Sequence, residues 1–319
     1  MSITTRLRTS PALVTFLLAP VIGELVSSSA PLPGFVVTWL PLALLYGCGA
    51  LLVHELSLRW RSGWLGIALL GAAYGIVEEG LVTRAFFDPN WPDLGMLATF
   101  GRDGGVNWLW AVQLTIYHAA ISIGVTLLLV RILFPDRWHR PWLTRRSMRW
   151  CAVGVGVWVV AGFGFYRPEA GLLIAAAGAV AGLTALARTV RPRAARGGTV
   201  PRPRRVFFAG LAGSAVVMLI PHLLAEVPDA DPAVALALVV GTVALVSWRA
   251  RRWAAAGWDD RHRFALAAGE LATFLVVGPV FTGSPWVTAT SVAVAVAGRR
   301  WWRRISDRVA AREPVEVTP

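Results

Sequence analysis

The sequence predicts an all-α membrane protein, a bundle of about ten transmembrane helices with both chain ends in the cytoplasm. Of its 319 residues, 56% are hydrophobic and only 15% are charged, whereas an ordinary soluble domain has about 25% charged residues. Apolar segments long enough to cross a bilayer recur from one end of the chain to the other. Arginine clusters fall between alternate segments, as expected where basic loops stay in the cytoplasm.

The hydropathy pattern predicts ten spans. They lie at residues 11–29, 35–53, 63–87, 107–134, 149–166, 169–187, 206–226, 233–248, 263–283 and 285–298.

The arginines set the expected orientation of these spans. All 31 basic residues are arginines, and only Arg84, Arg102 and Arg167 lie on the side opposite the two chain ends. The net charge of +13 therefore predicts contact with the bilayer and with anionic lipid at the cytoplasmic loops, and no nucleic-acid partner. The absence of lysine and the abundance of alanine, glycine and valine favour a GC-rich bacterium. We expect a multi-pass protein of the bacterial plasma membrane.

The first and third spans carry unusual acidic residues. Glu24 lies in the first span, and the adjacent Glu78 and Glu79 lie near the end of the third. An ionisable group inside a bilayer costs roughly 2.5–3.5 kcal/mol and usually faces a protein interior or a wet cavity. The helical rise of ~1.5 Å per residue places the glutamate pair roughly 10–13 Å below the outer interface. Gly71, Gly75 and Glu79 share one helical stripe, so a neighbouring helix can approach closely there.

The loop that follows, residues 88–107, is long for a compact protein. It contains an apolar patch between Leu94 and Phe100. Two interpretations are open: a cover over a site that opens outward, or an interfacial segment that rests on lipid.

The fourth span carries His118 at matched depth. The ring lies roughly 12–15 Å below the outer interface by the same helical rise. Thr115, His118 and Ser122 share a stripe, and Gln113 and Tyr117 lie beside it, so this span offers a polar face.

Residues 188–205 form a linker rich in proline, glycine and arginine, which cannot be a packed element. It divides the chain into a first part, 1–187, and a second part, 206–312; residues 313–319 are expected to be a disordered tail. In the second part, His222 lies at roughly 10 Å depth. Glu270 falls in the inner half of its span and is expected to belong elsewhere.

These groups permit several chemistries. Glu78, Glu79 and His118 are our catalytic candidates. The residues expected to support them from the surrounding positions are Glu24, Tyr117, Gln113 and Arg84. Carboxylates and imidazoles can act as general base and acid, or relay protons and bind a cation in a transporter. Glu79, His118 and His222 can also hold a divalent metal such as zinc. A buried, hydrogen-bonded cluster that only fixes helix packing remains a further possibility.

The pattern resembles the CAAX-processing and bacteriocin-processing (CPBP) intramembrane protease family. The resemblance rests on the Glu78-Glu79 pair, on His118 after a 39-residue gap, and on a further histidine, His222. Members of that family carry EExxxR, but here Thr83 occupies the arginine position and Arg84 comes one place later. The resemblance implies that a glutamate activates water and that the histidines ligate metal or stabilise an oxyanion.

We therefore predict an intramembrane hydrolase. A secondary transporter, in which the same glutamates bind the coupling ion, and a non-catalytic membrane scaffold are the alternatives.

Overall fold

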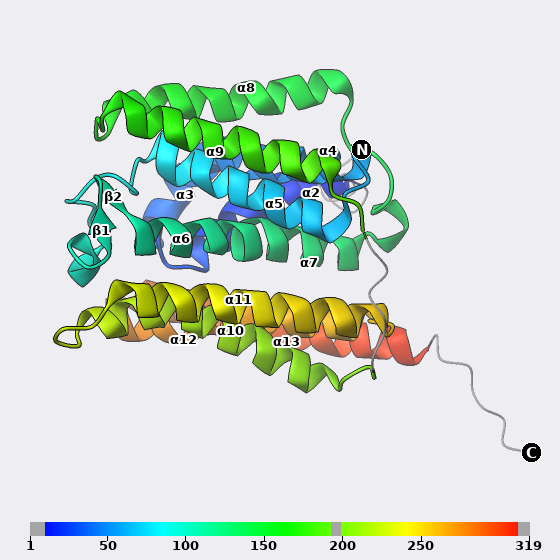
Figure 1. Ribbon diagram of the computed structural model, residues 1–319. Coiled ribbons are helices and arrows are strands. Elements are labelled where there is room, and N and C mark those ends of the chain that lie inside the picture. The colour runs from blue at the N-terminus through cyan, green and yellow to red at the C-terminus, as the bar shows by residue number, and fades with distance from the viewer. Residues whose placement is uncertain (1–9, 193–198, 312–319) are drawn as a thin grey trace, which may run out of the picture.

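The computed structural model describes residues 10–192 and 199–311 and shows an all-α polytopic membrane protein (Figure 1). The long helices run along one common direction, so their connections gather at two opposite ends of the bundle. The first part of the chain forms one group of helices, and the second part packs below it in this view. The predicted tail, 313–319, lies outside the described residues.

The first part contains helices interrupted by π-helical turns. Its α-helices are α2 (Pro11–Pro20), α3 (Gly34–Leu42), α4 (Cys48–Arg59), α5 (Gly63–Ile76), α6 (Trp108–Tyr117), α7 (Thr126–Leu133), α8 (Arg145–Ala161) and α9 (Ala170–Thr189). Its π-helical turns are η1 (Val21–Leu25), η2 (Ala43–Gly47), η3 (Val77–Val82) and η5 (His118–Val125). Each turn continues a neighbouring α-helix, so that α5 with η3, and α6 with η5 and α7, each form one long rod.

The second part contains four long helices. They are α10 (Pro203–Ala225), α11 (Pro232–Ala255), α12 (Asp260–Thr282) and α13 (Pro285–Ala310). Within the described linker residues, helix α9 ends at Thr189 and α10 begins at Pro203, so the predicted linker carries at most one helical turn at either end.

Among the described residues, eight helices are long and apolar enough to cross a membrane. The first predicted span corresponds to a shorter apolar helix, Pro11–Leu25. The last corresponds to the start of α13, whose second half is rich in arginine, from Arg299 to Arg308. The count of ten spans and the orientation in the bilayer stay predictions.

Burial identifies the inner helices. In the membrane-spanning windows, 61% of the residues of Gly63–Val82 and 67% of those of Trp108–Leu133 are buried, against 11% for each of α8, α9 and α11. The outer helices therefore expose apolar side chains around the bundle, and α5 and α6 with their π-helical continuations lie at its centre. The polar residues predicted for a site lie on these two central rods.

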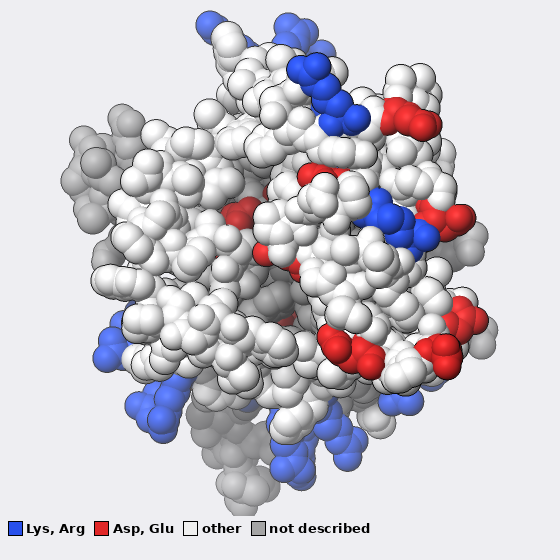
Figure 2. All heavy atoms as spheres, turned by 90° about the vertical axis from the view of Figure 1, so that its left-hand side faces the viewer, with Lys and Arg blue, Asp and Glu red and all other residues white. Residues whose placement is uncertain are grey.

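Residues 83–107 form one end of the bundle, which we call the hairpin end (Figure 1). Two short strands, β1 (Arg102–Asp103) and β2 (Val106–Asn107), pair there as an antiparallel hairpin. The Arg102 guanidinium donates hydrogen bonds to the carbonyls of Phe87, at 3.0 Å, and of Asp88, at 3.2 Å. Figure 2 looks onto this end, where acidic side chains gather along one edge and a hollow lies near the middle with acidic atoms visible inside.

The apolar patch of this loop packs inward. Leu94 and Leu97 are buried, and Gly95–Ala98 (η4) forms a 3-10 turn that contacts α10. The Asn107 side chain donates to the carbonyl of Leu97 and accepts from the backbone N–H of Trp110, which ties the patch to the start of α6. Leu94 and Leu97 therefore pack into the protein, whereas Met96 of the same patch is exposed.

Candidate functional site

Four π-helical turns supply the polar side chains of one interior site. A π-helical turn inserts an extra residue into a helix, re-aims the side chains that follow, and occurs frequently at functional sites. The turns η1, η2, η3 and η5 carry, in chain order, Glu24, Tyr46, the pair Glu78 and Glu79, and His118. The local departure from α-helix thus coincides with the polar residues on every one of these helices.

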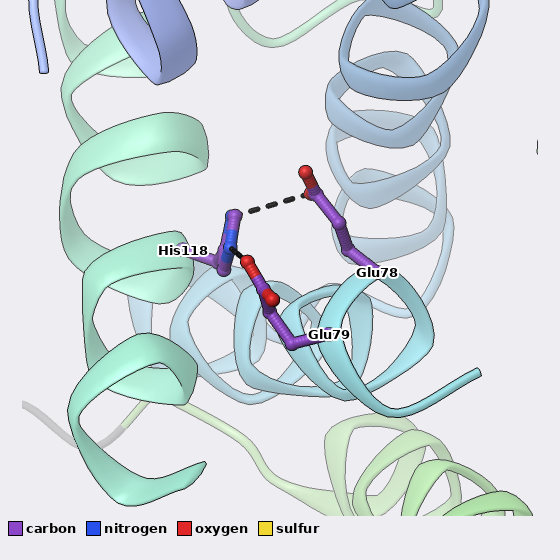
Figure 3. Close-up of side chains that lie close together, drawn as sticks. All are labelled: Glu78, Glu79 and His118. Atoms are coloured by element: carbon purple, nitrogen blue, oxygen red, sulfur yellow. Dashed lines mark hydrogen bonds and ion pairs between the residues drawn. The ribbon is translucent and has the colours of Figure 1, made fainter. Parts of the chain in front are cut away.

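Glu79 and His118 make the closest contact among Glu78, Glu79 and His118. His118 Nε2 lies 3.0 Å from Glu79 Oε1 (Figure 3). The other oxygen of Glu79 accepts a hydrogen bond from the Thr83 hydroxyl at 3.0 Å. Because an ionised carboxylate only accepts hydrogen bonds, Nε2 is assigned as the protonated nitrogen that donates to Glu79.

Glu78 approaches the opposite nitrogen of the same ring. Its Oε2 lies 3.3 Å from His118 Nδ1, and the side chain is almost completely buried. Ser122 lies 3.2 Å from the same nitrogen and donates when Nδ1 is unprotonated. Glu78 Oε2 itself makes no hydrogen bond of normal geometry to the described residues. A carboxylate oxygen without a hydrogen-bond donor in a buried place is costly, which indicates a position for a further ligand or proton.

Glycines allow the two central rods to approach this closely. A Cβ atom added at Gly75 would lie 2.9 Å from Cβ of His118, and one added at Gly71 would lie 2.9 Å from Cα of Ala119. The predicted small-residue stripe is therefore confirmed, and its partner is the turn η5. The absence of side chains at these positions puts the glutamates of η3 within reach of the imidazole.

Three tyrosines surround the imidazole ring. The ring centroids of Tyr46, Tyr74 and Tyr117 lie 6.0, 5.9 and 5.0 Å from that of His118. The Tyr117 hydroxyl donates to the carbonyl of Gly23 at 2.6 Å, which connects the end of α6 to η1. The Tyr74 hydroxyl is buried and makes no hydrogen bond of normal geometry to the described residues. The aromatic rings exclude water and restrict the orientation of His118.

Glu24 lies behind the central group. Its Oε1 accepts a hydrogen bond from the Tyr46 hydroxyl at 2.5 Å. Glu24 is thus connected to His118 through the Tyr46 ring.

The three central residues can hold a metal ion. One ligand atom from each of Glu78, Glu79 and His118 can be chosen so that all lie within 4.8 Å of one another. Two carboxylates and one imidazole suit a divalent cation such as zinc, with a further position open for water. The free Glu78 Oε2 is consistent with this fit.

His222 does not join the group, which corrects its predicted place as a metal ligand. Its ring packs edge-on against Trp110, with centroids 6.3 Å apart. Trp110 lies two helical turns before His118 on the same rod, a displacement of roughly 12 Å at the helical rise. Helix α10 therefore meets the rod nearer the hairpin end and leaves His222 at another depth.

Two predicted supporting residues also face elsewhere. Gln113 donates to the carbonyl of Met218 at 3.1 Å and so connects α6 to α10. Arg84 donates to the carbonyl of Tyr166 at 2.9 Å, and its guanidinium lies over the Phe163 ring, 4.5 Å from the centroid. Both therefore brace the helices around the site without contacting its carboxylates. Glu270 lines a cavity between α12 and the neighbouring helices that includes Tyr117 but none of Glu78, Glu79 and His118.

Tyr46 and Tyr74 are the site residues that the sequence analysis missed. The chain has only four tyrosines, and three of them surround one histidine. A buried tyrosine hydroxyl needs a hydrogen-bond partner. A tyrosine inside an apolar span therefore indicates a polar site, as a glutamine there does. Tyr46 and Tyr74 could have been recognised on that ground.

Comparison with known proteins gives a family and nothing more specific. The model of a family described as an uncharacterized membrane protein family matches residues 13–298. No curated protein and no solved structure matches the chain.

Proposed function

The chain belongs to this uncharacterized membrane protein family, and we propose that it is an intramembrane hydrolase of the protease type. The protein lies in a bacterial plasma membrane in this proposal, and its substrate is a membrane-embedded peptide or a lipid-linked bond. The observation that carries the proposal is the contact of one buried imidazole with two carboxylates, one at each ring nitrogen.

This geometry suits general acid–base catalysis. Glu78 has an oxygen without a hydrogen-bond donor, so it is the group available to take a proton from water as the water oxygen attacks a carbonyl carbon. Glu79 holds Nε2 and fixes the ring orientation. Glu78 passes this proton to Nδ1 of His118 across the 3.3 Å contact, and the imidazolium donates the Nδ1 proton to the leaving group while Nε2–H stays bonded to Glu79. Glu78 is then ionised again and His118 is neutral with its proton on Nε2, so the cycle closes.

A divalent metal held by the same residues would polarise the substrate carbonyl and its bound water. In that case Glu79 and His118 serve as ligands, and Glu78 either completes the ligand set or acts on the water. The ring nitrogen that remains free of metal would keep its carboxylate or hydroxyl partner, which orients a ligating histidine.

The resemblance to CPBP proteases supports this proposal in part. The glutamate pair and His118 correspond to the motif, and they lie together in space. Arg84, one place after the motif's arginine position, and His222 contact Tyr166 and Trp110 and not the carboxylates. The proposal therefore rests on three residues, and on the tyrosines that enclose them.

The direct test is a cleavage assay in liposomes. Purified protein is reconstituted with a library of apolar transmembrane peptides, and cleavage is read by mass spectrometry. We expect cleavage by the wild type and a loss of roughly 10²–10⁴-fold for Glu79→Gln and for Glu78→Gln, the usual contribution of general acid–base groups.

Glu270→Gln is the matched control. It removes a different carboxylate from a membrane-spanning helix, in a cavity outside the central group. Equal activity of Glu79→Gln and the wild type would refute the proposal. Equal losses in Glu79→Gln and Glu270→Gln would show only a general sensitivity to buried charge and would also count against it.

A further inference from the structure

A large apolar groove lies between the two parts of the chain, away from the polar site. One wall comes from α2 and η1, with Leu18, Val21 and Ile22, and the opposite wall comes from α12 and α13, with Leu271, Leu275 and Val292. The cavity volume is about 940 Å³, at the upper end of the roughly 300–1,000 Å³ of pockets that hold drug-sized molecules. It therefore has room for a molecule with a long chain.

Charge is present at two positions in this groove. Among the described residues that line it, Arg204 and Arg299 are the charged ones. Arg204 lies in the first turn of α10, which has no side-chain cap in the described structure. The free N–H groups of a helix start and its dipole favour an anion. Arg299, on α13, adds a second cationic group that lines the same space.

Aromatic residues mark the depth of these arginines. Trp301 and Trp302 follow Arg299 on α13 and also line the groove. Their rings pack on Phe264, with centroids 5.4 and 6.1 Å away. Tryptophans are enriched at the level of lipid headgroups, so the arginines lie where a headgroup phosphate would be, and the aliphatic walls continue toward the bilayer interior.

The geometry points to a bound phospholipid in this groove, with its phosphate between Arg204 and Arg299 and an acyl chain along α12. Basic pockets between transmembrane helices are suited to anionic headgroups. The inference is independent of hydrolysis at the polar site. It does connect the two places, because the wall residues Val21 and Ile22 belong to the same π-helical turn as Glu24.

Native mass spectrometry of the purified, delipidated protein with added phosphatidylglycerol tests this inference. We expect one lipid to remain bound at low lipid concentration, and at least tenfold weaker binding in the double variant Arg204→Gln/Arg299→Gln. The control is Arg205→Gln/Arg300→Gln, which removes the same charge from neighbouring exposed positions that do not line the groove. We expect this control to bind like the wild type.

A second variant tests the chain-binding part. Ala272→Trp fills the groove beside Leu271 without changing the charge, and it should also weaken binding. No tightly bound lipid in the wild type would overturn the inference. Equal losses in the two arginine variants would do the same, because they would indicate a diffuse electrostatic attraction in place of a site.

Discussion

Glu79 and His118 stand 39 positions apart in the chain, and Glu79 Oε1 lies 3.0 Å from His118 Nε2. Each residue belongs to a π-helical turn in a central rod, and the rods touch through glycine. The same imidazole meets Glu78 on its other side. This relationship has consequences for metal binding, packing and access that can each be measured.

The first prediction concerns metal. We expect purified protein to carry about one divalent ion per chain, as three protein ligands and a water suffice for a catalytic zinc site. His118→Ala should lose the ion, since it removes the imidazole ligand from the group. His222→Ala should keep it, because that ring packs against Trp110. Elemental analysis by mass spectrometry measures both. A wild type without metal would exclude the metal-dependent mechanism, and the mechanism would then be acid–base catalysis by the same three residues alone.

The second prediction concerns the close approach of the rods. Gly75→Ala places a methyl group 2.9 Å from Cβ of His118, so we expect destabilisation of about 1–3 kcal/mol from overpacking. Cleavage should fall as well, because the imidazole must shift. Gly178→Ala on α9 is the control, since a Cβ there meets nothing within 4 Å. Unfolding in detergent measures the stability, and equal stability of the two variants would contradict the packing argument.

The third prediction concerns the support behind the site. Tyr46→Phe removes the donor to Glu24 and leaves a half-buried carboxylate without its partner, which should cost about 1–3 kcal/mol. In a Glu24→Gln background the same substitution should cost less, because the carboxyl group that accepts the bond has already been replaced. Chemical unfolding of the wild type, the two single variants and the double variant gives the coupling free energy between Tyr46 and Glu24. Tyr166→Phe, at a surface-exposed tyrosine, is the control; a vanishing coupling would mean that the bond contributes nothing.

The fourth prediction separates a hydrolase from a transporter. Ser122→Cys replaces a hydroxyl beside His118 by a thiol of similar size, in a background where the buried Cys48 and Cys151 are alanine. A hydrolase site that opens toward the hairpin end should react with a membrane-impermeant maleimide from that side alone. Reaction from both sides would favour alternating access and the transporter.

The sequence by itself determined the structural class of the protein and which residues form its central group, Glu78, Glu79 and His118. Bilayer-length apolar segments can be identified directly in the sequence, because burial in lipid requires a continuous hydrophobic stretch. The cost of a charge in a bilayer singled out Glu78 and Glu79. Helical rise and periodicity then placed His118 at their depth and Gly75 on their face, since these quantities depend on local geometry alone.

Tertiary structure alone decided which polar residues face one another. The sequence predicts His222 at nearly the depth of the site and places Gln113 on the helix that leads to His118, but in the structure these side chains contact Trp110 and Met218. Tyr46 and Tyr74 join the site because η2 and α5 pack around His118. The π-helical turns rotate the side chains away from the regular helical period, so no count of residues along the chain could have given these directions.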